Sequence, residues 1–134
     1  MKAYIILGHP LVLIGIFLLL IIEGNHFGGF YLLYLLLALP HAALYALLAV
    51  AGILLIILGN KVVKKTSKII MLSLGLSMML LSLVVFFGRG DDKTGTFEQF
   101  IPLASFCLFG VSMICFIINS WQNFSEVEKK RSLI

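Results

Sequence analysis

Charged residues are scarce in this chain, with 10 Lys or Arg and 6 Asp or Glu among 134 residues. They make up 12% of the sequence, whereas soluble globular domains average about 25%. Together with 61% hydrophobic residues, this scarcity excludes an ordinary soluble domain. No acidic or basic residue lies near the middle of a long apolar run, which argues against proton-coupled transport because that normally needs an ionisable group at membrane depth.

Cysteine is also rare, and the two cysteines do not predict a disulfide. Cys107 and Cys115 lie eight residues apart in one apolar run, which corresponds to about 12 Å along a helix. A disulfide needs Cα atoms within about 7 Å of each other, so we interpret both as small packing residues. The sequence contains no phosphate-binding loop, metalloprotease spacing or nucleophile–base pair, and it is predicted not to be an enzyme.

Four long apolar runs occupy most of the chain: Ala3–Ile22, Phe27–Gly59, Ile69–Phe87 and Phe97–Ile118. Each approaches or exceeds the roughly 20 residues that cross a hydrocarbon layer about 30 Å thick. The first run lacks a following signal-peptidase site and is predicted to stay as a span. We therefore predict an all-α integral membrane bundle of four transmembrane helices over residues 1–122, followed by a basic tail over 123–134.

The basic residues predict the orientation of this bundle. With four spans, the N-terminus, the second connection and the C-terminus share one side, and most of the Lys and Arg residues fall there. The positive-inside rule then places both termini in the cytoplasm, most simply at a bacterial inner membrane. The net charge of +4 indicates contact with the lipid bilayer and not with nucleic acid. The predicted headgroup contacts are Lys61, Lys64, Lys65, Lys68, Lys129, Lys130 and Arg131.

The second run is too long for one straight span, since Phe27–Gly59 as a helix would extend about 50 Å. Pro40, followed by His41, is the expected site of a kink or break. Either one kinked helix projects beyond the bilayer, or a span from Pro40 onward follows a separate apolar piece. That piece, Phe27–Leu39, is apolar on every face and therefore needs lipid or protein around it. We expect self-association through this region, with another membrane subunit as the alternative partner.

Small residues at helical spacing predict where helices approach closely, because in lipid a close backbone approach replaces the hydrophobic effect. The second run carries a stripe with spacings of four, four, three and three, which would form one continuous helical face. The third run has two serines on one face, with Gly75 and Ser82 nearly opposite. Packing within the chain is the default interpretation. The predicted packing residues are Gly8, Gly15, Ala38, Ala42, Ala46, Ala49, Gly52, Ser73 and Ser77.

The fourth run carries a polar line in which Glu98, Ser105, Ser112 and Asn119 recur every seven residues. Residues seven apart lie nearly above one another on a helix. One interpretation is a pore-lining helix in a homo-oligomer, with Glu98 at the outer mouth and Asn119 at the inner mouth. The other is that the serines bond to their own preceding carbonyls or to a neighbouring helix.

The histidines His9, His26 and His41 raise the question of haem or metal binding. His9 and His41 are predicted at different depths, so no cofactor is expected. Each stands beside a proline, and its ring is predicted to bond to a carbonyl that the proline leaves free. The leading functional hypothesis is a homo-oligomeric pore or channel. A non-catalytic accessory or scaffold subunit is second, and a haem- or metal-binding membrane protein is third.

Overall fold

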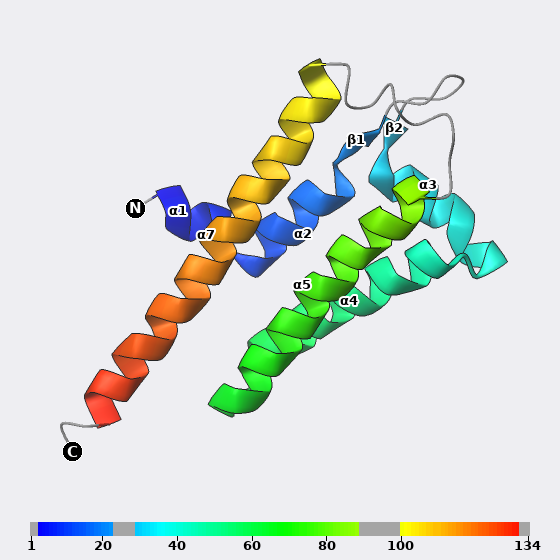
Figure 1. The fold of residues 1–134 in the computed structure, drawn as a ribbon. Coiled ribbons are helices and arrows are strands. Elements are labelled where there is room, and N and C mark those ends of the chain that lie inside the picture. Colours follow the sequence, from blue (N-terminus) through cyan, green and yellow to red (C-terminus); the bar gives the residue numbers. More distant parts are fainter. Residues whose placement is uncertain (1–2, 23–28, 89–99, 132–134) are drawn as a thin grey trace.

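The computed structural model describes residues 3–22, 29–88 and 100–131, and their side chains except at positions 4, 65 and 123–131. Within these ranges the chain is mostly helical, with one two-stranded ladder (Figure 1). The elements in chain order are α1 (Ala3–Leu7), α2 (Pro10–Leu18), β1 (Ile21–Ile22), β2 (Gly29–Phe30), α3 (Tyr31–Ala38), the 3-10 helix η1 (Leu39–His41), α4 (Leu44–Lys61), α5 (Lys65–Gly88) and α7 (Phe100–Arg131).

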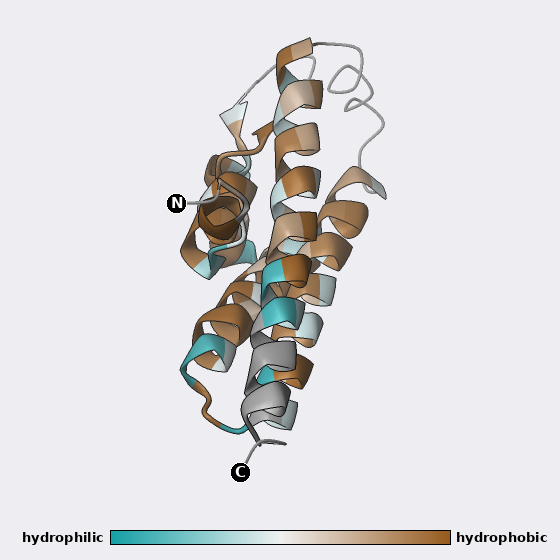
Figure 2. Ribbon diagram, turned by 90° about the vertical axis from the view of Figure 1, so that its left-hand side faces the viewer, coloured by the Kyte–Doolittle hydropathy of each residue, from teal (hydrophilic) through white to brown (hydrophobic). Residues whose placement is uncertain are grey.

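Three helices of the described chain are long and apolar enough to cross a membrane: Leu44–Lys61, Thr66–Gly88 and Phe100–Gln122. Helices α4 and α5 form an antiparallel hairpin joined by a short turn, and α7 runs past them with its C-terminal end toward the same end of the molecule as that turn (Figure 1). Hydrophobic residues cover most of these helices, and hydrophilic ones gather mainly toward the end where α4 passes into α5 (Figure 2). This is the architecture of a helical membrane protein.

The first apolar run is not the single continuous helix that its length predicts. It is divided into α1 and α2, with His9 between them in an extended conformation at φ −75° and ψ 134°. The cause is Pro10, which has no N–H to donate and disfavours a helical conformation at the residue before it. Pro10 instead occupies the first turn of α2, where its missing N–H would be unpaired in any case.

The two strands turn the chain back after α2. Ile21 pairs with Phe30, and Ile22 pairs with Gly29, in an antiparallel ladder. The Tyr31 N–H then donates to the Leu20 carbonyl at 2.8 Å. These bonds satisfy backbone groups that would otherwise be left unpaired in an apolar environment, and they set the position from which α3 begins.

The second apolar run is divided in the structure into α3 and α4. Pro40 lies in η1, and the next turn passes through Ala42, which has a left-handed conformation at φ 49° and ψ 37°. Ala42 is therefore exposed in a turn, and Ala38 belongs to α3. The five small residues of this run do not form one continuous helical face, because a helix cannot pass through a left-handed residue.

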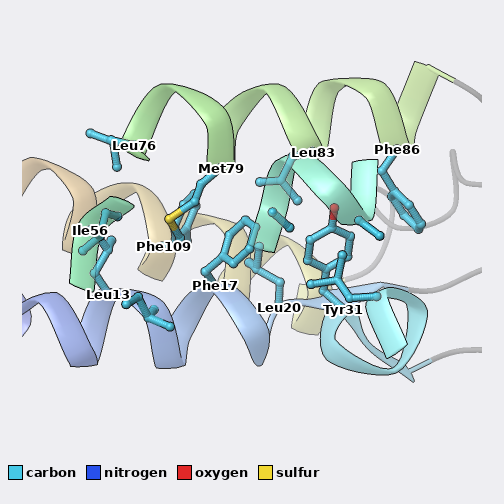
Figure 3. Packing of buried hydrophobic residues seen from close by; sticks show 14 of the residues in the cluster. Leu13, Phe17, Leu20, Tyr31, Ile56, Leu76, Met79, Leu83, Phe86 and Phe109 are labelled. Atoms are coloured by element: carbon cyan, nitrogen blue, oxygen red, sulfur yellow. The ribbon is translucent and has the colours of Figure 1, made fainter. Parts of the chain in front are cut away.

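The core lies where α2, α3, α4, α5 and α7 converge (Figure 3). Phe17 packs edge-on against Tyr31 with ring centroids 5.3 Å apart, and Tyr31 packs edge-on against Phe86 at 5.2 Å. Phe109 of α7 contacts the same group through Phe17 at 5.6 Å. Such aromatic pairs stabilise a structure by about 0.5–1.5 kcal/mol each beyond their buried area. The aromatic residues therefore join the N-terminal segment, the α4–α5 hairpin and α7.

Candidate functional site

Two serines of the predicted polar line on α7 contact the N-terminal segment of the same chain. Ser112 is fully buried, and its Oγ donates a hydrogen bond to the carbonyl oxygen of Leu7 at 2.8 Å. Leu7 is the last residue of α1. The hydroxyl therefore bonds to the backbone at the point where the first apolar run is interrupted.

The Leu7 carbonyl is available because of the His9–Pro10 break. In a continuous helix it would accept the N–H of Leu11. Here the Leu11 N–H donates to Nδ1 of His9 at 3.3 Å, so the histidine acts as the N-cap of α2. The His9 ring accepts a backbone N–H and does not donate to a freed carbonyl as predicted. Ser112 supplies the donor that the interrupted helix has lost.

Ser105 contacts the chain just after α2, at the first residue of β1. Its Oγ accepts the N–H of Ile21 at 3.2 Å and donates to the Pro102 carbonyl at 2.7 Å. Ser105 and Ser112 are one heptad apart, which is about 10 Å along α7. Because these serines contact both ends of the segment from Leu7 to Ile21, the two ends lie about 10 Å apart along α7. The three helices of the described chain that are long and apolar enough to cross a membrane do not include this segment.

The other two residues of the predicted polar line are Asn119 and Glu98. Asn119 is half-buried on α7, and Glu98 lies outside the described residues. Opposite the serines, the surface of α7 is apolar, with exposed aliphatic side chains along its length. These are Leu103, Val111, Ile114, Ile117 and Ile118. The structure thus brings Ser105 and Ser112 together with α1 and α2, on the inner side of α7.

The small residues predicted for helix packing separate into two groups. On α4, Ala46, Ala49 and Gly52 are buried. A Cβ added at Gly52 would lie 2.8 Å from the Gly75 carbonyl oxygen, and one added at Gly75 would lie 2.8 Å from the Gly52 carbonyl oxygen. The two backbones therefore cross in close contact at these glycines.

The second group lies away from that crossing. Ser73 and Ser77 are on the exposed face of α5, where the Ser77 hydroxyl donates to the Ser73 carbonyl at 2.9 Å. Gly8 is buried beside the α1–α2 break, whereas a Cβ at Gly15 would meet nothing within 4 Å. These four positions do not contribute to the α4–α5 contact.

A buried polar chain that the sequence reasoning missed links α3 to the hairpin. The Ser82 hydroxyl donates to the Tyr45 carbonyl at 2.6 Å. The Tyr31 hydroxyl lies 2.6 Å from Ser82 Oγ, and we assign it as the donor because the serine proton is already used. Tyr31 and Ser82 are both fully buried. Ser82 was noted as a small residue, but no spacing in the sequence pairs it with a tyrosine 51 positions earlier.

Side chains that commonly bind metal ions do not gather into a cluster in the described part of the chain. Among those residues, no group of three or more His, Cys, Asp or Glu side chains is placed to hold a metal ion. His9 and His41 are exposed, and His26 lies outside the described ranges. No family model, curated protein or solved structure matches this chain. Its function is therefore inferred from the arrangement of its own residues.

Proposed function

We propose that this protein is a non-catalytic accessory or scaffold subunit of a membrane complex. The observation that carries the proposal is the direction of the α7 serines. Ser105 and Ser112 bond to backbone groups of the chain's own N-terminal segment, so their hydroxyls are used for folding. The opposite face of α7 is apolar and suits lipid or a partner helix better than water.

The proposed location is a bacterial inner membrane, with the lysine-rich end of the bundle in the cytoplasm. Lys61 and Lys64 lie at the α4–α5 turn, and the C-terminal end of α7 lies toward the same end of the molecule (Figure 1). The positive-inside rule assigns that end to the cytoplasm. The predicted cytoplasmic N-terminus assumed a full first crossing, so fusions of a compartment-sensitive reporter to each terminus test the two ends separately.

The proposed contact surface is the outer face of α3. Tyr31, Leu35 and Ala38 face the core, whereas Leu36 and Leu37 are more than half exposed. An eight-residue helix is too short to cross a bilayer. It also lacks the polar face of a helix that lies at the membrane surface. We assign this face to a helix of a different membrane protein.

Site-specific photo-crosslinking tests the assignment. A photoreactive residue at Leu36, which is 55% exposed, is compared with one at Leu54 on α4, which is 52% exposed. The expected result is one crosslinked product of defined mass from Leu36 and none from Leu54. A product of twice the chain mass would show that this face of α3 contacts a second copy of the chain and not a different membrane protein. Lipid adducts alone from both positions would overturn the proposed docking.

A homo-oligomeric pore is the second candidate, and the seven-residue recurrence from Glu98 to Asn119 is the observation that favours it. Native mass spectrometry of the detergent-solubilised protein measures whether a closed ring of several copies forms. Ion flux into liposomes then compares wild type with Glu98→Gln, which keeps the size of the side chain at the predicted outer mouth. A ring with flux that depends on Glu98 would displace the accessory-subunit proposal. Co-purification of a different membrane protein in a fixed stoichiometry, together with no ion flux, would support the accessory-subunit proposal.

A further inference from the structure

A group of basic residues lies at the α4–α5 turn without a described acidic side chain to pair with. Lys61 and Lys64 are exposed, and Lys68 is half-buried one turn into α5. None of the side chains that the structure describes is acidic. These lysines are therefore not neutralised within that part of the chain, and they fall within eight residues of one another at the α4–α5 turn. Hydrophilic residues gather at that end of the hairpin (Figure 2).

The start of α5 adds further positive potential at the same place. The Lys68 N–H donates to the Lys64 carbonyl at 3.0 Å, so the first helical turn begins at Lys64. No acidic residue lies in that turn, and the N–H groups there have no partner inside the helix. Lysines beside a helix N-terminus repel its dipole, whereas a bound anion would be attracted to both. Thr66 and Ser67 bring two hydroxyl groups to the same turn.

Val63 indicates which kind of anion fits. It lies between Lys61 and Lys64 and is 99% exposed, so no protein atom covers its apolar side chain. Helix α4 has 18 residues and is about 27 Å long, close to the thickness of the hydrocarbon layer. The turn is thus expected at headgroup level, where lysines meet phosphates and an apolar side chain can contact the acyl boundary.

We propose that residues 61–68 form a binding site for the headgroup phosphate of an anionic phospholipid. Lys61, Lys64 and Lys68 supply the charge, the first turn of α5 supplies backbone N–H donors, and Val63 contacts the lipid. A free phosphate ion shares the charge but offers no apolar surface to Val63. The proposal concerns a local site and not the general attraction of a basic protein to an acidic membrane.

The test measures the thermal stability of the full-length protein in a neutral detergent, with added phosphatidylglycerol or with phosphatidylcholine of the same acyl chains. Phosphatidylglycerol is expected to raise the Tm more strongly. The double variant Lys64→Gln/Lys68→Gln should weaken the apparent phosphatidylglycerol affinity about tenfold or more, given the contribution of each lysine near an anionic surface. The matched control Arg89→Gln/Lys93→Gln removes the same charge between the third and fourth apolar runs, away from the predicted headgroup contacts, and should keep the affinity within about twofold.

Three results would overturn the proposal. Equal weakening in the two double variants would mean that net charge alone attracts the lipid. Equal stabilisation of the wild type by both lipids would show no selection of the headgroup. Stabilisation by inorganic phosphate to the same extent as by phosphatidylglycerol would replace the lipid with a free anion. Helical content and Tm without lipid, measured for every variant, separate loss of binding from loss of folding.

Discussion

The α4–α5 hairpin and the N-terminal segment on α7 are both built from apolar sequence, but they are held together in different ways. In the hairpin, two uninterrupted helices cross at Gly52 and Gly75, where the backbones are in contact. In the N-terminal segment, α1 and α2 are separated at His9 and Pro10. There the contact with α7 includes hydrogen bonds between serine hydroxyls and free backbone groups: Ser112 donates to the Leu7 carbonyl, and Ser105 accepts the Ile21 N–H.

The difference follows from the state of the backbone. A continuous helix satisfies its own N–H and C=O groups, so its neighbour needs only to fit closely, and glycine permits that. An interrupted helix leaves a carbonyl such as that of Leu7 without its donor, so its neighbour must provide one. Polar residues in an apolar helix can therefore mark the contact with a broken segment as well as the wall of a pore.

The largest expected effect is at the glycine crossing. Gly52→Ala would place a methyl group 2.8 Å from the Gly75 carbonyl oxygen, which is backbone and cannot move aside easily. We expect the free energy of unfolding to fall by about 2–3 kcal/mol. Gly110→Ala on α7 is the control, because a Cβ there meets nothing within 4 Å. It should be neutral or stabilise by up to about 1 kcal/mol. Unfolding in mixed detergent micelles, followed by circular dichroism, measures both variants, and equal losses would contradict the close crossing.

The next effect concerns the polar chain that joins α3 to the hairpin. Ser82→Ala leaves the buried Tyr31 hydroxyl without an acceptor and should destabilise the protein by about 2 kcal/mol. Tyr31→Phe removes that hydroxyl and leaves Ser82 bonded to Tyr45, so we expect a smaller loss of about 1 kcal/mol. The same unfolding measurement compares them. A larger loss for Tyr31→Phe than for Ser82→Ala would contradict the assignment of Tyr31 as the donor in its hydrogen bond with Ser82.

Ser112→Ala tests the contact between the N-terminal segment and α7. It removes the donor to the Leu7 carbonyl and should reduce the unfolding free energy by about 1 kcal/mol, typical of hydrogen bonds between helices in membranes. Hydrogen exchange should increase in α1 and α2 and stay unchanged in the α4–α5 hairpin. The control Ser77→Ala loses only an exposed bond within its own helix and should change stability by less than about 0.5 kcal/mol. Increased exchange spread evenly over all helices would argue against a local role.

The smallest predicted effect is a gain in stability at the turn before α4. Ala42 has a positive φ of 49°, which glycine adopts without the steric conflict of a Cβ. Ala42→Gly should therefore stabilise the protein by about 0.5–1 kcal/mol. Ala46→Gly, four residues later and buried inside α4, should have the opposite sign and destabilise by about 1 kcal/mol or more. A loss at both positions would show that the left-handed turn is not a source of strain.

Hydropathy along the chain was sufficient to predict three apolar runs that contain the long helices α4, α5 and most of α7, because length and apolar composition are local properties that a membrane selects directly. The division of the second run before α4 was expected from Pro40 and not from hydropathy. The reasoning from hydropathy predicted one helix over Ala3–Ile22 and was wrong. The run is long enough, but Pro10 interrupts it, and whether an interrupted run still crosses depends on its neighbours. The recurrence of Ser105 and Ser112 was visible in the sequence, whereas their partners Ile21 and Leu7 were not.

The sequence by itself determined that the chain is apolar enough to suit a membrane, and that its positive charges are concentrated beside its helix ends. Both follow from composition and local order along the chain. Only the tertiary structure decided which small residues touch, such as Gly52 with Gly75, and which hydroxyl serves which carbonyl. These contacts join residues far apart in sequence, and a serine or glycine on a helix gives no local sign of the partner that folding will bring to it.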